Sequence, residues 1–578
     1  MIGKGHLSLI FKNWICSRYT VFIGCLFAYS LIVNYSGGMG GFLLRVSTGE
    51  IIIKWEYYEF FLLLYLYGYF NCILRPSRWQ AFVAALPIFL AYLGQDIYYI
   101  MYSSVFRLAV LASFTELLQV LTTKLLCALF FVVVLPLGTF FYSIDLKKYR
   151  TIIVGIVPIV LLVGAVEYFP ESYVRIYSKI GSEIIYWSDS MSVENNGRFM
   201  MLLFREAELR TAQHKTKQFR NRPVYAQKSA EMAKWVEDRG NGRNIHLIVL
   251  ESFMNPHLLH GATFSKDPVH PAFQELFGDS VGLSLSPVFG GRTSQAEFEA
   301  LCGAPAFEEL VGVEFNSFTG APAYCLPWTL EQAGYRTIAS NSFNPGFFNT
   351  SSAYKGIGFG EMYFPQEFVG KANSYLVTGD TTDEMGFIFD RELFEQNLNF
   401  ITPIIEQKQK KPVFNYLLTV YGHVPHLMNA QQRPLVLKMF SKFEDQWLER
   451  SANQFYYRTQ AVAEYVNKLR RLDPSSLIIL VSDHLPPGQF GKASYERLRY
   501  LDNTADSVHK NLVMIIENNK VKKYATIHHY DIPAIILNYL SDGQYCSNHQ
   551  CGFAENRLID DKDSRHDDYM EVMAHASE

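Results

Sequence analysis

The sequence predicts two structural parts: an N-terminal α-helical transmembrane bundle of about five helices, and an α/β domain around a central, mostly parallel sheet. Three observations support this fold class. Apolar segments of about 20 residues, long enough to cross a bilayer core, fill residues 1–170. Beyond residue 243, short β-branched runs alternate with helical patterns, as in a parallel α/β sheet. Two of these runs end abruptly in carboxylate and imidazole side chains, at the sheet edge where such folds bind ligands.

The N-terminal part is expected to cross the membrane five times, because it has too little polar surface for a soluble helical domain. The expected spans are Tyr19–Tyr35, Tyr57–Leu74, Ala81–Tyr102, Lys124–Tyr142 and Thr151–Phe169. Basic residues precede the first span and follow the second and the fourth, which indicates a cytoplasmic N-terminus. An odd number of spans then places the rest of the chain outside. No convincing cleavage site follows the first span, which is therefore expected to remain as an anchor.

The chain is expected to divide into four segments. These are a transmembrane domain (1–170), a juxtamembrane helical connector (171–243), an extracytoplasmic α/β catalytic domain (244–545) and a charged C-terminal tail (546–578). A plain solvated linker is an equal alternative for the connector by composition. The tail is expected to be solvated, because it carries acidic clusters without a repeat. The expected core strands of the catalytic domain are Ile245–Leu250, Arg336–Ala339, Val413–Val420, Leu477–Val481 and Leu512–Ile516.

The overall charge argues against one class of partner. The chain has a formal net charge of −3, with 19% charged and 49% hydrophobic residues. A nucleic-acid-binding domain would normally show a strong basic excess, so no nucleic acid partner is expected.

The stretch Gly290–Leu301 combines a glycine pair, hydroxyl residues and the start of a helical pattern. Ser294 and Glu297 have the spacing of a capping box, which predicts that the helix starts there. Thr293 then lies where unpaired N–H groups and the positive end of the helix dipole favour an anion. That environment lowers the cost of a threonine alkoxide beside a phosphate.

Two predicted strands end in polar side chains that can meet Thr293. One strand leads into Glu251, and another leads into Asp483 and His484. Because the ends of parallel strands share one sheet edge, these side chains are expected to lie together. Two carboxylates, an imidazole and a hydroxyl predict a site for a divalent ion such as Mn²⁺ or Zn²⁺.

These motifs resemble a known family. The Leu-Glu-Ser strand end, the Gly-Arg-Thr-Ser-x-x-Glu-Phe loop and the Ser-Asp-His strand end are similar to those of lipoteichoic acid synthases and of Gram-negative phosphoglycerol transferases that decorate periplasmic glucans. Both groups belong to the alkaline phosphatase/sulfatase superfamily, and the resemblance covers about residues 244–545. It implies one divalent ion, Mn²⁺ or Zn²⁺ with Mg²⁺ as a further option, held by Glu251, Thr293, Asp483 and His484. It also implies that Thr293 is the nucleophile.

The resemblance extends to the substrate-binding residues, with one departure. His423 matches a His-x-Pro motif, which implies that it contacts the phosphate or protonates the leaving group. Phe348 and Asn349 match an aromatic-Asn-Arg motif that holds glycerol phosphate, but Thr350 replaces the Arg. Loss of a bidentate phosphate clamp is not conservative. Lys355 or Arg292 would have to compensate, or the head group is phosphoethanolamine instead.

The cysteines carry information about the compartment. Four lie in the expected membrane region, and Cys302, Cys325, Cys546 and Cys551 lie in the soluble part. If that part is exported, Cys302–Cys325 and Cys546–Cys551 form the nearest-neighbour pairing among three possible ones, with free buried thiols as the alternative. Disulfides indicate a bacterial periplasm and therefore an inner-membrane protein.

The sequence and the resemblance therefore predict a metal-dependent transferase that moves a phosphoglycerol head group from phosphatidylglycerol to an envelope glycan through a phospho-threonine. The expected acceptor is a periplasmic glycan or another envelope polysaccharide. A phosphoethanolamine transferase, a head-group hydrolase and an inactive envelope-assembly scaffold are the alternatives. A formylglycine sulfatase is disfavoured, because Cys302-Gly-Ala-Pro305-Ala lacks the Cys-x-Pro-x-Arg spacing. The acceptor, the metal and the oligomeric state are left open.

Overall fold

A computed structural model describes most of the 578-residue chain and divides it into two compact units, Met1–Thr211 and Ala212–Glu578. The described residues are 18–35, 43–47, 50–54, 57–102, 130–185, 189–220, 224–310, 312–366, 376, 380–382, 386–407, 411–559 and 561–578. The division falls inside a single helix, whereas the four-segment division made from the sequence stays a prediction.

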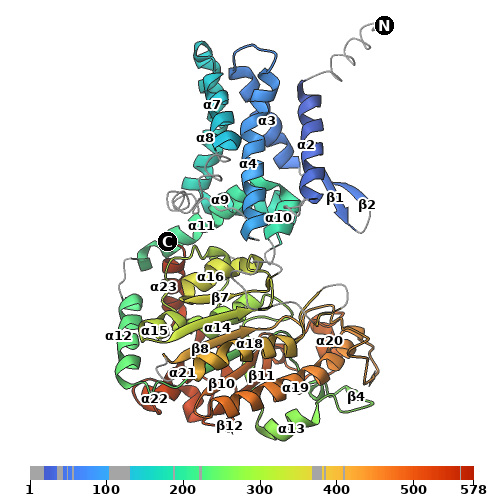
Figure 1. Cartoon of the computed structure of the whole chain (residues 1–578), viewed down its shortest axis with the longest axis vertical. Helices are drawn as coiled ribbons and strands as arrows, with labels where there is room; N and C mark the ends of the chain where they lie inside the picture. Colours follow the sequence, from blue (N-terminus) through green and yellow to red (C-terminus); the bar gives the residue numbers. More distant parts are fainter. Residues whose placement is uncertain are drawn as a thin grey trace. The chain divides into compact units, whose positions relative to one another are not determined.

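The first unit is helical (Figure 1). Its helices are α2 (Arg18–Tyr35), α3 (Tyr57–Ile73), α4 (Gln80–Tyr102), α7 (Leu135–Tyr142), α8 (Tyr149–Tyr168), α9 (Pro170–Ile180), α10 (Asp189–Asn196) and α11 (Arg198–Arg220). A π-helical turn, Phe130–Val134, leads into α7, and β1 (Leu43–Ser47) pairs antiparallel with β2 (Glu50–Lys54). Helices occur at all five positions where spans are expected, although residues 124–129 of the fourth lie outside the described residues.

Two of the described helices are long and apolar enough to cross a membrane, Gln80–Tyr98 within α4 and Leu146–Tyr168, which includes α8. The helix α8 leaves Ile153, Val154 and Leu161 60–71% exposed. Such a surface is costly in water and typical of lipid contact. At the other three expected spans, the described parts of the helices are shorter or less apolar than a membrane span needs, so five crossings remain a prediction.

Buried polar contacts hold α11 to α3 and α4 within the first unit. Glu59 is fully buried and accepts hydrogen bonds from the Tyr92 hydroxyl and from the backbone N–H groups of Phe199 and Met200. A carboxylate of α3 therefore satisfies two of the N–H groups that the first turn of α11 leaves free.

An ion pair lies beside this contact. Arg198 of α11 pairs with Asp96 of α4 at 2.7 Å, and their side chains are only 2% and 3% exposed. The Tyr29 hydroxyl of α2 also donates to Asp96. Burial makes such a pair expensive to break, since one partner would then be left charged and unpaired.

The second unit is built around a nine-stranded sheet in the order β13-β5-β11-β10-β3-β8-β6-β7, with β12 paired to β11. Its strands are β3 (Ile245–Leu250), β5 (Gly282–Leu285), β6 (Arg336–Asn341), β7 (Glu361–Tyr363), β8 (Val413–Leu418), β10 (Leu477–Ser482), β11 (Lys510–Glu517), β12 (Lys520–Lys522) and β13 (Ile527–His528). The pair β4 (Ala262–Phe264) and β9 (Met439–Ser441) forms a separate two-stranded sheet.

The five strands expected from the sequence are all present, and the central sheet is mixed. The strands β10, β3, β8, β6 and β7 are parallel, whereas β11 runs antiparallel to β10, β12 and β5. The apolar run of β11 could not indicate its direction, because any strand covered on both faces is apolar throughout.

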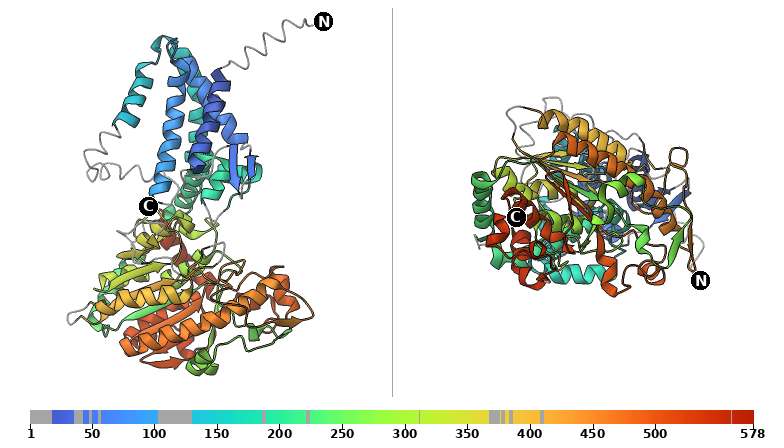
Figure 2. Two further views of the ribbon diagram at one scale, coloured as in Figure 1. Left: turned by 45° about the vertical axis from the view of Figure 1, so that its right-hand side comes forward. Right: turned by 90° about the horizontal axis from the view of Figure 1, so that it is seen from below.

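Helices cover both faces of the sheet. They are α12 (Val224–Arg239), α13 (Pro271–Phe277), α14 (Thr293–Cys302), α15 (Leu326–Gln332), α16 (Thr350–Ile357), α18 (Asp390–Ile405), α19 (Gln446–Leu472), α20 (Lys492–Arg497), α21 (Ile532–Leu540), α22 (Gln544–Asn548) and α23 (His566–Ala576). The helices α13, α18 and α19 pack over one face, around a core that includes Leu393, Val462 and Leu480. The helices α14, α15 and α21 form a second group, away from the orange α19 in Figure 2.

The C-terminal segment differs from the solvated tail expected from its charges. Residues 566–576 form α23, in which Tyr569, Met573 and Ala576 are fully buried. The backbone N–H of Thr319 donates to the Ala576 carbonyl. The prediction was wrong because the acidic cluster before Tyr569 dominates the composition, while the apolar residues of α23 bury enough surface to order the segment.

Candidate active site

The site begins where β3 and β10 end. These strands are parallel neighbours with Leu250 paired to Ser482, so the next residues, Glu251 and Asp483, leave the sheet side by side. Thr293 comes from a different element, as the first residue of α14. The structure therefore brings together residues that are far apart in the sequence.

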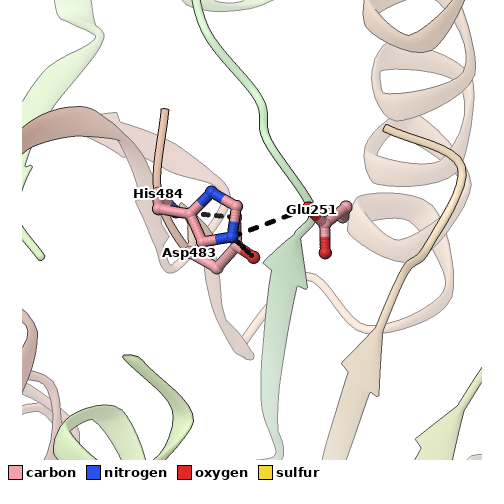
Figure 3. A group of neighbouring side chains, drawn as sticks. All are labelled: Glu251, Asp483 and His484. Atoms are coloured by element: carbon pink, nitrogen blue, oxygen red, sulfur yellow. Dashed lines mark hydrogen bonds and ion pairs between the residues drawn. The ribbon is translucent and has the colours of Figure 1, made fainter. Parts of the chain in front are cut away.

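Four side chains converge at this edge. The Thr293 hydroxyl oxygen lies 2.8 Å from Asp483 Oδ2 and 3.2 Å from Glu251 Oε2. His484 Nε2 lies 3.2 Å from Asp483 Oδ2 and 3.7 Å from Glu251 Oε1 (Figure 3). All four side chains are buried. The convergence that the strand ends predicted from sequence is thus present in the structure.

The hydrogen bonds around His484 and Asp483 leave the His484 Nε2 lone pair available to bind a metal ion. His484 Nδ1 lies 2.9 Å from the Leu485 carbonyl oxygen, which favours the tautomer with a proton on Nδ1 and a lone pair on Nε2. Asp483 Oδ1 accepts from the N–H groups of Ser252 and His484, so Oδ2 faces Thr293. Among the described residues, His484 Nε2 has no hydrogen-bond partner.

These atoms fit a divalent ion. Ligand atoms of Glu251, Asp483 and His484 lie within 4.8 Å of one another. The buried His484 Nε2 makes no hydrogen bond within the described part of the chain and faces both carboxylates, an arrangement that a Lewis acid between them would stabilise. Carboxylate and imidazole ligands suit Zn²⁺ and Mn²⁺. Which metal the protein uses stays a prediction.

The electrostatics reflect two acids crowded into a dry site. Burial raises the pKa of Asp483 to about 7, and the negative charge of Glu251 adds to the effect. Burial also opposes ionisation of Glu251, but His484, His423, the hydrogen bond from the Ser252 hydroxyl and Arg458 together outweigh it, and the pKa of Glu251 is lowered. Without a metal, Asp483 is therefore partly protonated near neutral pH, and a cation has to displace that proton.

A second layer of residues, not indicated by the motifs, fixes Glu251. Its backbone N–H donates to the Thr419 hydroxyl, and its carbonyl accepts from Arg458 Nη1 at 2.7 Å. Arg458 lies on α19, is 1% exposed and pairs with Asp390 at 2.7 Å. A Cβ on Gly422 would lie 2.1 Å from the Glu251 carbonyl oxygen, so the approach of this loop requires glycine.

Ser252 is a further residue that the motif analysis did not single out as functional. It adopts a left-handed conformation with φ 49°, which is strained for a side chain other than glycine. In this conformation its N–H reaches Asp483 Oδ1 and its hydroxyl donates to Glu251 Oε1. Ser252 therefore links the two carboxylates directly.

The start of α14 differs from the predicted capping box. Arg292, with φ 63°, is the N-cap residue and provides no side-chain cap. The Ser294 hydroxyl has no partner among the described residues, and Glu297 Oε1 instead accepts from Tyr354 and Tyr416. The prediction was wrong because burial of α14 supplies Glu297 with stronger tertiary donors than a backbone N–H.

The predicted substrate-binding residues have different surroundings. Arg292 forms an ion pair with Glu308. Asn349 donates to the carbonyls of Phe315 and Phe318 at 2.7 and 2.8 Å, so its amide is used within the fold.

The remaining predicted contacts also differ in exposure. Phe348 is 7% exposed, and Lys355 is exposed beside Gly320. Within the described part of the chain, no hydrogen bond joins Phe348, Asn349 or Lys355 to the Glu251–Asp483–His484 cluster.

His423 lies at the same sheet edge, just beyond β8. Its Nδ1 is 2.9 Å from the Val424 carbonyl oxygen, and its ring packs against Phe387 with centroids 5.3 Å apart. This contact favours a proton on Nδ1 and leaves Nε2 for a ligand. Three residues on, His426 is fully buried, which lowers its pKa to about 4.

Two disulfides join the soluble cysteines as Cys302–Cys325 and Cys546–Cys551. This is the nearest-neighbour pairing of the three that the sequence allows. Cys25 and Cys72, in the helices of the first unit, are free.

A mixed α/β sheet with two carboxylates, an imidazole and a hydroxyl at one edge is the arrangement of the alkaline phosphatase/sulfatase superfamily, whose enzymes are metal-dependent. The chain belongs to the sulfatase family, whose model matches residues 243–542. The match starts within one residue of the predicted catalytic domain and covers β3 to α21.

Curated relatives resemble the same region. The chain is 27% identical over 254 residues to a candidate cyclic beta-1,2-glucan modification protein of Rhizobium meliloti, covering 42% of this chain and 36% of that protein. It is 23% identical over 282 residues to a lipoteichoic acid synthase of Staphylococcus saprophyticus, covering 47% and 40%. The chain therefore spans less than half the length of these relatives.

A solved structure also aligns with the fold. A phosphoglycerol transferase of Streptococcus pyogenes in complex with sn-glycerol-1-phosphate is 17% identical, with a TM-score of 0.47, and the alignment covers 61% of this chain and 91% of that one. Cys302, the cysteine of the Cys-Gly-Ala-Pro stretch, is paired with Cys325 and is therefore not available for conversion to formylglycine.

Proposed function

We propose that this protein is a membrane-anchored transferase that moves a phosphoglycerol head group from phosphatidylglycerol to a periplasmic glycan. The proposal includes the predicted topology, with a cytoplasmic N-terminus in the bacterial inner membrane and a periplasmic catalytic domain. The relatives named for lipoteichoic acid synthesis and for glucan modification support this substrate pair.

The observation that carries the proposal is the position of the Thr293 hydroxyl. It lies at the N-terminus of a buried helix, within 3.2 Å of both Glu251 and Asp483. A buried hydroxyl placed beside two carboxylates and an imidazole is suited to attack a phosphodiester. A divalent ion held by Glu251, Thr293, Asp483 and His484 would supply Lewis-acid stabilisation of phosphoryl charge.

The reaction would proceed in two half-reactions at Thr293. Its Oγ1 attacks the phosphorus, its proton passes to Asp483 Oδ2 at 2.8 Å, and the bond from phosphorus to the diacylglycerol oxygen breaks. His423 enters this step as the imidazolium, with a proton on both ring nitrogens, and delivers its Nε2 proton to that leaving oxygen. An acceptor hydroxyl then attacks the phospho-threonine and gives its proton to His423 Nε2, the P–Oγ1 bond breaks, and Thr293 regains its proton from Asp483.

Intact-mass spectrometry of the full chain, incubated with Mn²⁺ and each phospholipid separately, tests the proposal. Phosphatidylglycerol should add one phosphoglycerol group to the wild type and none to Thr293→Ala. The matched control is Ser294→Ala, which removes the neighbouring hydroxyl that has no hydrogen-bond partner. Adduct formation in Thr293→Ala, or its loss in Ser294→Ala, would contradict the assignment of the nucleophile.

Phosphoethanolamine transfer is a second candidate because of two observations in the loop before α16. Thr350 replaces the expected Arg and donates to the Phe347 carbonyl, while Asn349 is bound within the fold. A phosphoethanolamine adduct in the same experiment would establish this donor. Steady release of diacylglycerol without an adduct or acceptor would indicate a hydrolase, and no lipid turnover would indicate a scaffold.

A further inference from the structure

An exposed aromatic surface lies on the catalytic unit. Phe440 of β9 is 55% exposed, and Phe490, in the loop before α20, is 52% exposed. The rings of Phe443 and Phe490 lie 5.2 Å apart, so the two segments that carry these residues meet. We call this surface the aromatic–basic patch and define it by its residues: Phe440, Phe443, Phe490, Lys438, Lys442, Lys492 and Arg497.

The patch has an excess of positive charge. Residues 438–444 and 489–499 contain five basic and two acidic side chains. The Arg497 guanidinium lies 4.6 Å from the Phe443 ring centroid, and the Lys492 ammonium lies 5.7 Å from that of Phe289. Aromatic rings and cations are therefore presented together, which is the composition that binds an anionic lipid surface.

The patch rests on a packed support that includes the site. A buried cluster of Leu448, Leu485, Tyr495, Leu498 and Tyr500 lies under it, and Phe443 and Phe289 pack against that cluster. Leu485 directly follows His484, and Phe289 lies four residues before Thr293. The Gly290 Cα also approaches Pro487 so closely that a Cβ there would lie 3.1 Å from the proline ring. Docking of the aromatic–basic patch on a surface would therefore also hold the candidate active site in place.

We propose that the aromatic–basic patch docks on an anionic phospholipid bilayer, with Phe440 and Phe490 entering the head-group region. Exposed phenylalanines are costly in water, and the basic side chains beside them match the charge of anionic head groups. The same chain carries helices long enough to cross a membrane. This inference goes beyond the proposed function, because it concerns where the catalytic unit binds and not which group it transfers.

Tryptophan fluorescence of the full chain in proteoliposomes tests the docking. The variant F490W is compared with the control L558W, which places Trp at a 42% exposed site outside the patch, and both retain the seven native tryptophans. In vesicles of equal parts phosphatidylcholine and phosphatidylglycerol with brominated acyl chains, F490W should be quenched beyond the wild type and L558W should not. Equal quenching of the two variants would overturn the proposal.

A second measurement examines the charges. In the F490W background, K492Q should weaken the lipid-dependent quenching by about fivefold in apparent affinity, the effect of removing one basic residue from an anionic surface. Pure phosphatidylcholine vesicles or high salt should reduce the quenching in the same way. Quenching that is unchanged by K492Q, by pure phosphatidylcholine vesicles and by high salt would overturn the electrostatic part of the proposal. If the F490W side chain is shielded from solvent but not quenched by lipid, and the particles are larger than a monomer, the patch binds a second copy of the chain instead of the bilayer.

The quenching experiment needs no turnover, so its failure is distinct from failure of the proposed transfer. If F490W is quenched by lipid but no adduct forms on Thr293, the docking proposal is supported and the proposed transfer is contradicted. If the adduct forms while F490W and L558W are quenched equally, the proposed transfer is supported and the docking proposal is contradicted.

Discussion

At the scale of single residues, the site depends on groups that hold the reactive side chains. Arg458 connects the Asp390 carboxylate to the Glu251 carbonyl, and Thr419 receives the Glu251 N–H. Both backbone polar groups of the metal-ligand candidate Glu251 are therefore satisfied by side chains from other elements. Such contacts fix a ligand more tightly than the strand end alone could.

The variant Arg458→Met tests this positioning role. It leaves Asp390 charged, fully buried and unpaired, and we expect a loss of about 3 kcal/mol in unfolding free energy. Adding Asp390→Leu should restore most of the stability, whereas Mn²⁺ affinity should stay weakened by about 10–100-fold. Thermal unfolding and isothermal titration with Mn²⁺ measure the two effects. Wild-type metal affinity in the double variant would show that Arg458 is only structural.

A second prediction at the residue scale concerns Glu299, whose pKa burial raises to about 8 from 4.5. The folded chain keeps this proton as pH rises above 4.5, whereas the unfolded chain loses it. The unfolding free energy therefore falls between pH 4.5 and about 8, after which the penalty is complete. Glu299→Gln retains an oxygen that accepts from the Ala306 N–H, and its side chain does not ionise in this pH range.

Relative to the wild type, Glu299→Gln should gain stability as pH rises through that window, by on the order of 1–4 kcal/mol. Melting temperatures of both proteins across the window measure this gain. A constant difference between them would show that Glu299 does not bind the proton in the folded state.

At the scale of elements, α11 is the helix in which the two compact units divide, and its start is tied to the first unit. Glu59 of α3 receives its N-terminal N–H groups, and Asp96 of α4 pairs with Arg198. Three helices thus meet in one buried polar cluster. The amphipathic pattern of α11 could not reveal this, since the partners belong to apolar helices far away in the sequence.

We expect Asp96→Ala to destabilise the first unit more than the double variant Asp96→Leu with Arg198→Met. The single change removes the carboxylate from a buried guanidinium, at a cost of about 3 kcal/mol or more, whereas the double change removes both charges. Thermal unfolding in detergent compares the variants. Glu171→Ala is the control, because its ion pair with Arg175 is mostly exposed. Equal losses in the single and double variants would contradict a coupled pair.

At the scale of the whole molecule, folding and metal binding should be coupled. The candidate ligands come from β3, β10 and α14, which assemble only in the folded chain. An ion that binds only the folded state raises its stability by about 2.7 kcal/mol at a concentration one hundred times its Kd.

Addition of Mn²⁺ should therefore raise the melting temperature of the full chain, and chelation should lower it. His484→Ala should abolish the shift, while His257→Ala, at a surface pair with Asp267, should retain it. Binding should release protons near neutral pH, because the pKa of Asp483 is about 7 without metal. A metal-induced shift that persists in His484→Ala would place the ion elsewhere.

The sequence by itself determined the local features. Apolar runs predicted the five strands and the helices of the first unit, and their polar ends predicted which side chains meet at the sheet edge. These predictions work because a strand or a helix is specified by neighbouring residues, and parallel strands share their carboxyl edge by topology.

Only the tertiary structure decided the contacts made across the chain. In the tertiary structure, β11 runs antiparallel to β10 and α23 is buried. The Asn349 amide forms its hydrogen bonds within the fold, and Glu297 accepts hydrogen bonds from two tyrosines instead of forming a capping box. The tertiary structure also places Arg458 and Thr419 around Glu251. Buried polar groups take whichever partners the packed chain supplies, and no local pattern encodes partners that lie tens to hundreds of residues away.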